Sequence, residues 1–191
     1  MITWYATVDS PIGRLFLVKR GEALSGLYME AHARAPAKDA AWREAPTRFD
    51  REATQVREYF DGGRTCFDLP LDLAGTPFQR RVWELLRAIP YAETVSYGAV
   101  ARALGLPGAS RAVGAASARN PVSIVVPCHR VVGKNGELAG YAGGFERKRW
   151  LIDWEARHGA PSGKLGTLAT PFGLRPPAVD GAVHRFHEHV G

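Results

Sequence analysis

The hydrophobic pattern of the chain changes its period at Thr76 and Pro77, and this change limits the folds that are open to it. Within residues 2–29 the apolar side chains alternate in short runs, as they do in strands. After Pro77 they recur every three or four residues, as on one face of a helix. Threonine followed by proline also starts helices, because the hydroxyl caps free amides and proline fits the first helical position. We therefore expect strands first and helices afterwards.

The first lobe is predicted to span residues 1–72 and to be an α/β unit, a small antiparallel sheet plus one helix. The strands follow from alternation, and the helix follows from apolar residues at helical spacing that end at two glycines. The expected elements are strands at residues 2–8, 14–20 and 23–29, a loop at residues 32–46 and a helix at residues 48–61.

The second lobe is predicted to be mainly helical and to span residues 76–158. Its first helix ends at Pro90. Two short helices, Tyr97 to Leu104 and Ala109 to Arg119, are joined by a turn that contains glycine, which indicates a helix-turn-helix. An ordinary helical hairpin is the alternative on pattern alone.

The second helix of this pair is unusual because nearly all of its side chains are small, and Arg111 and Arg119 are its long ones. A helix that reads base edges in the major groove normally carries several long polar side chains. A smooth helix with one arginine is better suited to a narrow groove, with that arginine wedged into the base stack.

Charge and composition narrow the classes of partner and compartment. The 191 residues carry a net charge of +6 with a pI near 9.6, which favours a polyanionic partner such as DNA. The chain has no apolar run of 18 residues, and its first residues lack the pattern of a signal peptide, so we expect a cytoplasmic protein without a membrane span. Its two cysteines, Cys66 and Cys128, are expected to be free thiols.

The sequence Pro127-Cys128-His129 places a thiol next to an imidazole, which makes Cys128 a candidate nucleophile. Pro127 indicates that the strand-like apolar run 124–126 ends there and that Cys128 begins a turn or helix, whose N-terminus would favour the thiolate. The proton would pass between Cys128 and His129 directly or through one water. The alternative is that Cys128 is a small buried apolar residue.

The stretch from Thr76 to Glu155 resembles the O6-alkylguanine-DNA alkyltransferases, and the N-terminal lobe resembles that family more loosely through residues 9–13. Several motifs occur in the family's order and spacing. They are Pro77-Phe78-Gln79, Val82-Trp83, Ile89-Pro90, Thr94-Val95-Ser96-Tyr97-Gly98, Arg111-Ala112-Val113-Gly114, Asn120-Pro121, the segment from Pro127 to Gly133, and Gly140-Tyr141-Ala142-Gly143-Gly144.

The resemblance implies a suicide repair protein that moves an alkyl group from O6 of guanine, with O4 of thymine left open, to Cys128 after the nucleotide is flipped out through the minor groove. It implies no cofactor. The reacting residues would be Cys128 as acceptor, His129 as proton relay, Glu155 as holder of the imidazole, Tyr97 as proton donor to guanine and Asn120 as the pin of the turn. The DNA-binding residues would be Tyr97, Ala109, Ser110, Arg111, Ala112 and Gly114, and the substrate pocket would contain Ser117, Val131, Tyr141, Ala142 and Gly143.

The residues themselves support one of these roles. Glu155 shares an apolar helix face with Leu151 and Ile152, where a carboxylate needs a buried partner such as histidine. A solvated surface charge is the alternative for Glu155.

The chain departs from the family pattern at a few positions. Ala92 stands where the family usually has glycine, and Ala142 where some relatives have serine. The first lobe offers only Cys66 and His32 as zinc ligands, so no metal is expected, and Cys66 is interpreted as structural within a strand-like Thr65-Cys66-Phe67.

The expected partner is double-stranded DNA that contains O6-alkylguanine, bound by a monomer, with clustering on DNA left open. Three other functions compete. They are a protein that binds alkylated DNA without reacting, a cysteine hydrolase with a Cys-His-Glu triad, and a helix-turn-helix transcription factor. Residues 159–191 are predicted to be a flexible tail, in which His184, His187 and His189 are more typical of an extension than of a metal site.

Overall fold

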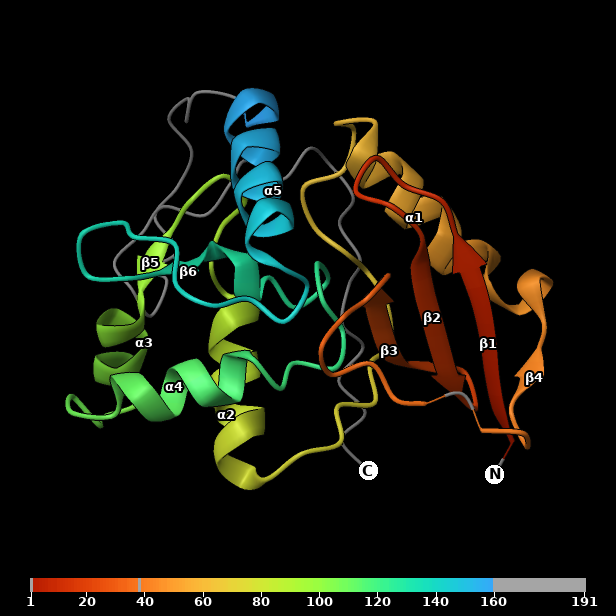
Figure 1. Ribbon diagram of the computed structural model, residues 1–191, viewed down its shortest axis with the longest axis horizontal. Helices are drawn as coiled ribbons and strands as arrows, with labels where there is room; N and C mark the ends of the chain where they lie inside the picture. Colours follow the sequence, from red (N-terminus) through yellow and green to blue (C-terminus); the bar gives the residue numbers. More distant parts are fainter. Residues whose placement is uncertain (1, 38, 160–191) are drawn as a thin grey trace, which may run out of the picture.

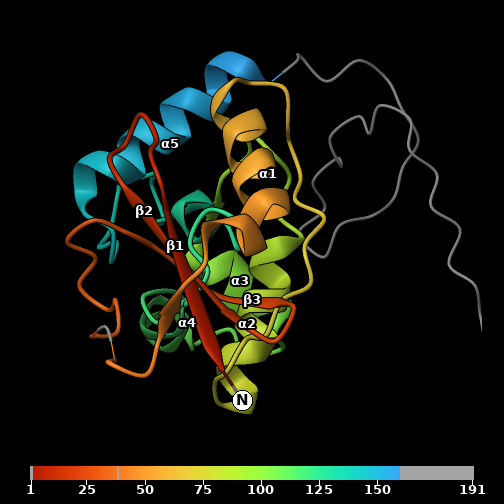
Figure 2. The ribbon, with the colours of Figure 1, turned by 90° about the vertical axis from the view of Figure 1, so that its right-hand side faces the viewer.

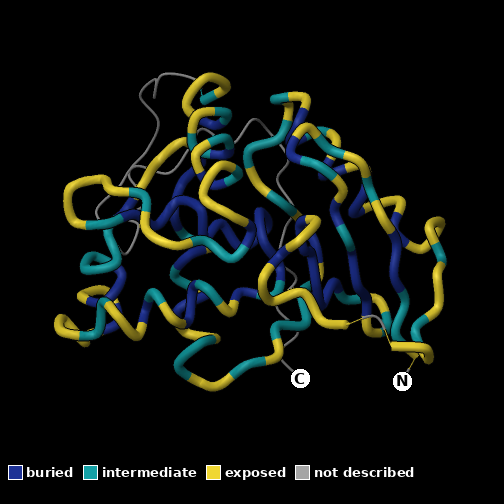
Figure 3. Tube along the Cα trace, in the orientation of Figure 1, coloured by how far each residue is buried: buried dark blue, intermediate teal, exposed yellow. Residues whose placement is uncertain are grey.

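The structure is a computed structural model that describes residues 2–37 and 39–159. It has two lobes that lie side by side, a sheet with one long helix and a cluster of helices (Figure 1). One hydrophobic core contains buried residues of both lobes, and Figure 3 shows the buried chain running through their contact. The predicted tail, with its three histidines, lies outside the described residues apart from Gly159.

The first lobe contains the three predicted strands, β1 (Thr3–Val8), β2 (Leu15–Arg20) and β3 (Ala23–Met29), which pair antiparallel in sequence order. The sheet is nevertheless mixed. A two-residue strand, β4 (Arg43–Glu44), pairs parallel to β1 inside the segment that was predicted to be only loop. A strand this short carries no alternation, so the sequence contains no signal for it.

The helix α1 (Asp50–Phe60) follows the short 3-10 helix η1 (Pro46–Phe49) and runs alongside the strands (Figure 2). It ends where Gly62 takes a left-handed conformation, with φ of 78°. A buried ion pair between Lys19 of β2 and Glu52 of α1, 3.2 Å long, joins the helix to the sheet.

The second lobe begins with α2 (Pro77–Arg87), which ends before the predicted Pro90. Its start has the expected capping box, because Thr76 Oγ1 accepts from the Gln79 amide and the Gln79 side chain accepts from the Thr76 amide. The pair α3 (Tyr97–Ala103) and α4 (Ser110–Ser117) forms the predicted helix-turn-helix, and α4 is shorter than predicted at both ends. The last helix is α5 (Phe145–His158).

Two further short strands were not predicted in this lobe. The strands β5 (Val95–Ser96) and β6 (Val131–Val132) pair in parallel, so they bring the start of α3 to the segment that follows Cys128. The pairing joins residues 36 positions apart, which no local pattern encodes. Within the described residues, no helix is long and apolar enough to cross a membrane.

The lobes are joined along the free edge of β3. The Leu27 amide donates to the Pro121 carbonyl (2.9 Å), and the Ser123 amide donates to the Leu27 carbonyl (3.0 Å). The segment that leads to Cys128 is therefore hydrogen-bonded to the sheet of the other lobe.

Candidate active site

Two tight turns place Cys128. Ile124 has a φ of 73°, in the left-handed region that β-branched residues rarely adopt, and the Val125 amide donates to the Ser123 carbonyl (2.9 Å). The next turn closes between the Cys128 amide and the Val126 carbonyl (2.8 Å), and Cys128 begins the 3-10 helix η2 (Cys128–Arg130). The prediction of a turn or helix at Cys128 is confirmed, whereas the strand-like run before it is a turn.

The Cys128 thiol is buried, with 5% of the residue exposed. Asn120 Nδ2 donates to Cys128 Sγ (3.0 Å) and to the Val126 carbonyl (2.7 Å), while its Oδ1 accepts from the Val122 amide (3.0 Å). Burial raises the pKa of the Cys128 thiol, and the Asn120 hydrogen bond and the Lys148 charge only partly oppose this. The backbone hydrogen bond at Cys128 lowers the pKa of the thiol, in the direction expected of a helix N-terminus, but desolvation outweighs it.

His129 and Glu155 form a buried pair, with 0% and 1% of their side chains exposed. His129 Nε2 lies 2.8 Å from Glu155 Oε1. The carboxylate is ionised, because its neighbours hold its pKa well below the usual range, so Nε2 carries the proton and donates it. His129 Nδ1 is then an unprotonated acceptor, and it is buried without a hydrogen-bond partner among the described residues. The alternative of a solvated Glu155 is wrong.

No hydrogen bond joins Cys128 directly to His129 in the described part of the chain. Of the two routes predicted for the proton, the structure therefore leaves the one through a water. Burial lowers the pKa of His129 more than Glu155 raises it, so the imidazole is neutral near pH 7 and can accept a proton.

Sequence reasoning assigned no role to three other partners of Glu155. Arg130 binds both carboxylate oxygens, from Nε to Oε2 (2.8 Å) and from Nη2 to Oε1 (2.9 Å). The Tyr59 hydroxyl of α1 donates to Oε1 (2.7 Å), and the Ala92 amide donates to Oε2 (3.2 Å). Arg130 is part of the Pro127–Val132 motif, which was a usable signal, but nothing local connects Tyr59 to Glu155.

The backbone at Ala92 has a conformation that suits glycine, the residue expected there from the family pattern. Ala92 has a φ of 63°, a left-handed conformation that glycine adopts without strain. Its amide contact with Glu155 is a backbone contact, so alanine keeps it.

Lys148 of α5 is a further residue to which the sequence assigned no role. It is fully buried, which is rare for a lysine and was therefore not expected. Its Nζ donates to the carbonyls of Val131 (2.6 Å) and Ala139 (3.0 Å) and lies 3.5 Å from the Tyr97 hydroxyl. Burial lowers the pKa of Lys148 to about 8, and burial and the nearby Cys128 raise the pKa of the Tyr97 phenol. Lys148 thus ties Tyr97 to the segment after the nucleophile.

Of the predicted pocket residues, Tyr141 interacts directly with Cys128. Burial and the neighbouring Cys128 raise the pKa of the Tyr141 phenol well above its usual range. Gly143 has no room for a side chain, because a Cβ atom there would meet the Met29 sulfur and the Tyr141 ring. Val131 is buried, the Ser117 hydroxyl is buried without a hydrogen-bond partner among the described residues, and Ala142 is half-buried.

Apart from Tyr97, which begins α3, the predicted DNA-binding residues lie on α4 and its N-terminal turn. Arg111 and Ala112 are exposed, and Ala109, Ser110 and Gly114 are half-buried. A Cβ atom at Gly114 would lie 3.7 Å from the Tyr97 ring, so α4 is close to this tyrosine. Within residues 2–37 and 39–159, Arg111 has no ion pair or side-chain hydrogen bond. Its guanidinium is therefore available to a ligand.

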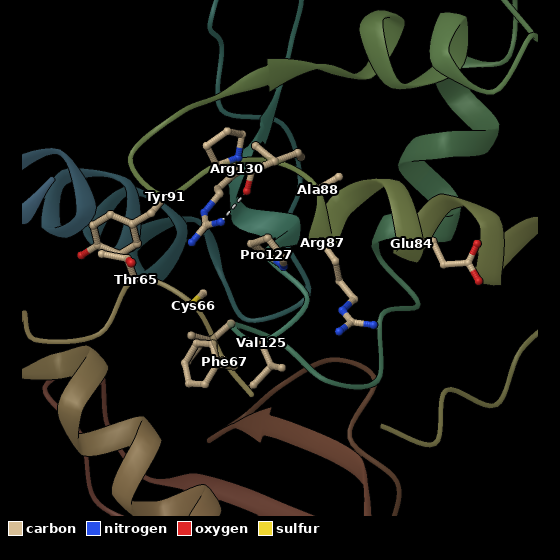
Figure 4. Close-up of a pocket in the computed structure, with 13 residues that line it drawn as sticks. Thr65, Cys66, Phe67, Glu84, Arg87, Ala88, Tyr91, Val125, Pro127 and Arg130 are labelled. Carbon is tan, nitrogen blue, oxygen red and sulfur yellow. Dashed lines mark hydrogen bonds between the residues drawn. The ribbon is translucent and has the colours of Figure 1, made fainter. Parts of the chain in front are cut away.

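A separate pocket of about 430 Å³ lies behind the nucleophile, where Arg130 donates to the Ile89 carbonyl (2.7 Å; Figure 4). Pro127, Arg130 and Tyr91 line it, but Cys128 does not, so it is distinct from the predicted alkylguanine pocket. Cys66 lies at this pocket in a bend and is exposed, so the prediction of a structural, strand-like Cys66 is wrong.

The described residues also include the two side chains considered for zinc. His32 is buried and contacts Ser123 Oγ (3.4 Å) through Nε2 and the Arg34 amide (3.1 Å) through Nδ1. Among residues 2–37 and 39–159, no three His, Cys, Asp or Glu side chains form a group that could hold a metal ion.

Comparison with known proteins accounts for both lobes. Residues 77–157 match the family model for the DNA-binding domain of 6-O-methylguanine DNA methyltransferase, and residues 3–73 match the model for the ribonuclease-like domain of the same proteins. A methylated-DNA–protein-cysteine methyltransferase of Mycolicibacterium paratuberculosis is 50% identical over 158 residues, 83% of this chain and 95% of that protein. One of Methanosarcina acetivorans is 43% identical over 153 residues, 80% of this chain and 97% of that protein.

Solved structures agree with these matches. The crystal structure of Mycobacterium tuberculosis OGT in complex with DNA is 47% identical, with a TM-score of 0.77, and covers 81% of this chain and 94% of that one. The crystal structure of Mycobacterium tuberculosis O6-methylguanine methyltransferase is 45% identical, with a TM-score of 0.75, over 85% of this chain and 97% of that one. With both lobes matched in order and the fold shared, the chain belongs to the 6-O-methylguanine DNA methyltransferase family.

Proposed function

We propose that this protein repairs alkylated DNA by moving one alkyl group from O6 of guanine to Cys128, once per molecule. The observation that carries the proposal is the buried row of Asn120, Cys128, His129 and Glu155, which supplies a nucleophile, a base and a support for the base. The family membership and the similarity to methyltransferases and to a structure bound to DNA support the same conclusion.

The reaction begins with the thiol proton. Cys128 is neutral in the closed pocket, and a water would carry its proton to His129 Nδ1, which has no other partner among the described residues. Glu155 then stabilises the imidazolium through the hydrogen bond to Nε2. Asn120 donates to the sulfur throughout and so lowers the energy of the thiolate.

The sulfur then attacks the alkyl carbon, a C–S bond forms and the bond from that carbon to O6 breaks. The electron pair returns to the guanine, which takes a proton from Tyr97. Lys148 lies beside the Tyr97 hydroxyl, and its pKa is below the usual value. Its ammonium group helps to balance the negative charge that is left on Tyr97. Releasing the alkyl group from the thioether would require the Cys128 thiolate to leave, and it is a poor leaving group there, so the alkyl group stays on Cys128 and the molecule acts once.

Access to the base requires the nucleotide to leave the duplex. We propose that α4 enters the minor groove and that Arg111 fills the space that the flipped nucleotide leaves in the base stack. The flipped base then enters a pocket beside Tyr97. The other pocket residues are Ser117, Val131, Tyr141, Ala142 and Gly143. The small-residue surface of α4 supports this mode, as does Arg111, which is exposed and has no side-chain partner within the described part of the chain. We further propose that the protein acts as a monomer and without a cofactor, and that alkyl groups on O4 of thymine are a second substrate to be tested. The proposed domains are residues 1–72 and 76–158, followed by a tail of residues 159–191.

Intact-mass analysis after incubation with a duplex that contains O6-methylguanine tests the function. We expect one added methyl group per protein, mapped to Cys128 by peptide analysis, and at most one equivalent of repaired lesion. Repair beyond one equivalent would contradict the suicide mechanism, and bound but unrepaired lesion would favour the non-reacting alternative.

Arg111→Ala is expected to slow repair in duplex DNA by about tenfold or more and to leave reaction with free O6-benzylguanine nearly unchanged. Extrusion of a base costs a few kcal/mol in duplex DNA, whereas the free base needs no extrusion. Single-turnover rates on both substrates measure the difference. Arg57→Ala, which removes an exposed arginine from α1, controls for loss of one positive charge. Equal losses on both substrates would show that Arg111 is not a wedge.

Alkylation of Cys128 is expected to destabilise the protein by about 1–3 kcal/mol, and more for benzyl than for methyl. The sulfur is buried at 3.0 Å from the Asn120 amide, so added carbon atoms must displace that side chain. Calorimetry of unreacted, methylated and benzylated protein, in a Cys66→Ser background that removes the exposed thiol, gives the comparison. Unchanged or raised melting temperatures for both adducts would show that the pocket adapts without strain.

A further inference from the structure

Tyr59 belongs to the first lobe, yet its phenol reaches the carboxylate of the second. It lies on α1 with 0% exposure, and its hydroxyl donates to Glu155 Oε1 at 2.7 Å, across 96 positions of sequence. The same oxygen accepts hydrogen bonds from His129 Nε2 (2.8 Å) and from Arg130 Nη2 (2.9 Å). Tyr59 and His129 therefore share one acceptor atom.

Sharing an acceptor has an electronic consequence. Each donor draws electron density from the carboxylate oxygen, so the oxygen attracts the other donors less strongly. The donation from Tyr59 thus weakens the hold of Glu155 on the proton at His129 Nε2. Burial and the adjacent Glu155 raise the pKa of the Tyr59 phenol well above its usual range, so it stays a donor across the working pH range.

The surrounding contacts hold the phenol in place. Trp154 Nε1 of α5 donates to the Tyr59 carbonyl (3.2 Å), and the Tyr59 ring packs edge-to-face on Phe60 and Tyr91, with centroids 5.1 and 6.0 Å apart. A fully buried ring packed in this way does not turn away from Glu155 without opening the contact between the lobes.

We propose that Tyr59 is a positioning residue of the first lobe, which fixes the orientation of Glu155 and limits how strongly that carboxylate retains the proton of His129. The inference rests on the proposed alkyl transfer, in which His129 accepts the thiol proton. The pKa of His129 in the second lobe would therefore depend on the first lobe being packed correctly against it. The two lobes would then react as one unit even though the nucleophile, base and wedge all lie in the second.

The charged and titratable groups around the pair come from several elements. They are Tyr59 from α1, Tyr91 from the loop after α2, Cys128 and Arg130 from η2, Tyr141 from the segment before α5, and Lys148 from α5. Tyr59→Phe changes one of these donors, alters no charge and keeps the ring. It is therefore the variant that isolates the hydrogen bond.

Tyr59→Phe is expected to shift the acid limb of the transfer rate upward by about half a pH unit, a loss of about threefold at pH values below the midpoint. Without the Tyr59 hydroxyl, Glu155 stabilises the His129 imidazolium more strongly, so the pKa of His129 rises. On acidification, the neutral imidazole is then lost at a higher pH than in the wild type. The rate of the transfer step at saturating duplex is measured from about pH 5 to pH 8, together with the Kd for DNA, which should stay within about twofold because Tyr59 is buried away from α4.

Three variants make the result specific. Tyr5→Phe removes a phenol hydrogen bond to a different carboxylate of the first lobe, Glu44 (2.9 Å), and Trp154→Phe removes the contact with the Tyr59 carbonyl but leaves the phenol. Both should keep the wild-type pH profile. Incorporation of 3-fluorotyrosine at position 59 keeps the side chain and makes the phenol a stronger donor, so it should move the acid limb in the opposite direction.

The outcomes separate this inference from the proposed function. No alkyl transfer by the wild-type protein would overturn the proposed function itself. If the wild type transfers the alkyl group and Tyr59→Phe has the same pH profile of the transfer rate, only the role of Tyr59 is overturned. A transfer rate that falls equally at every pH, in parallel with lost stability, would have the same meaning. If Tyr59→Phe does not fold, the 3-fluorotyrosine protein decides, because an unmoved acid limb overturns the inference.

Discussion

Cys128→Ser is expected to abolish alkyl transfer, by about 10⁴-fold or more, while the affinity for duplex DNA stays within about twofold. A hydroxyl has a far higher pKa than a thiol and is a poor nucleophile toward saturated carbon, and neither Asn120 nor His129 can compensate for that. DNA binding is spared because the residue is buried, with 5% exposed, and does not lie on the surface of α4.

Transfer of a labelled methyl group from duplex DNA to protein, with fluorescence anisotropy for binding, measures both quantities. Cys66→Ser is the matched control, because it removes the other thiol from an exposed bend and should react normally. Label that persists in Cys128→Ser, or that maps to Cys66, would place the acceptor elsewhere.

Glu155→Gln is expected to lower the free energy of unfolding at pH 7 by about 3–5 kcal/mol, the largest stability effect expected from a single charge in this protein. Glu155 accepts from His129, Arg130, Tyr59 and the Ala92 amide, and it compensates the buried guanidinium of Arg130. An amide keeps the shape but removes the charge and replaces one acceptor with a donor, which leaves Arg130 buried without its counterion.

Urea unfolding followed by circular dichroism measures the loss. Asp153→Asn on the same helix is the control, because Asp153 is exposed and its change should stay within about 0.5 kcal/mol. A Glu155→Gln protein as stable as this control would show that the carboxylate contributes no net stability.

The pH dependence of the same variant follows from the lowered pKa of Glu155. A carboxyl whose pKa is lower in the folded than in the unfolded state stabilises the protein above its unfolded pKa, about 4.3, and loses that contribution as the pH falls toward the folded value. The stability difference between wild type and Glu155→Gln should therefore be full at neutral pH and shrink below about pH 4.3. A difference that stays constant through this range would mean that the charge is not its source.

The sequence by itself determined the elements whose signals are local. The capping residue Thr76 starts a helix where predicted, because capping depends on hydrogen bonds within one turn. Alternation located the three long strands, and the ordered series of motifs between Pro77 and Gly144 indicated the family. The place of Glu155 on an apolar helix face indicated a buried partner but left a solvated charge open, and the structure decided between them.

Only the tertiary structure decided the features that depend on distant residues or on burial. Tyr59 meets Glu155 across 96 positions, β4 pairs with β1, and Lys148 has its ammonium inside the protein. Burial also reversed the expected effect on the Cys128 thiol, whose pKa rises although its neighbours favour the thiolate. The physical reason is common to all of these: desolvation and long-range hydrogen bonds depend on which segments pack together, and that information is spread over the whole chain rather than contained in any one stretch of it.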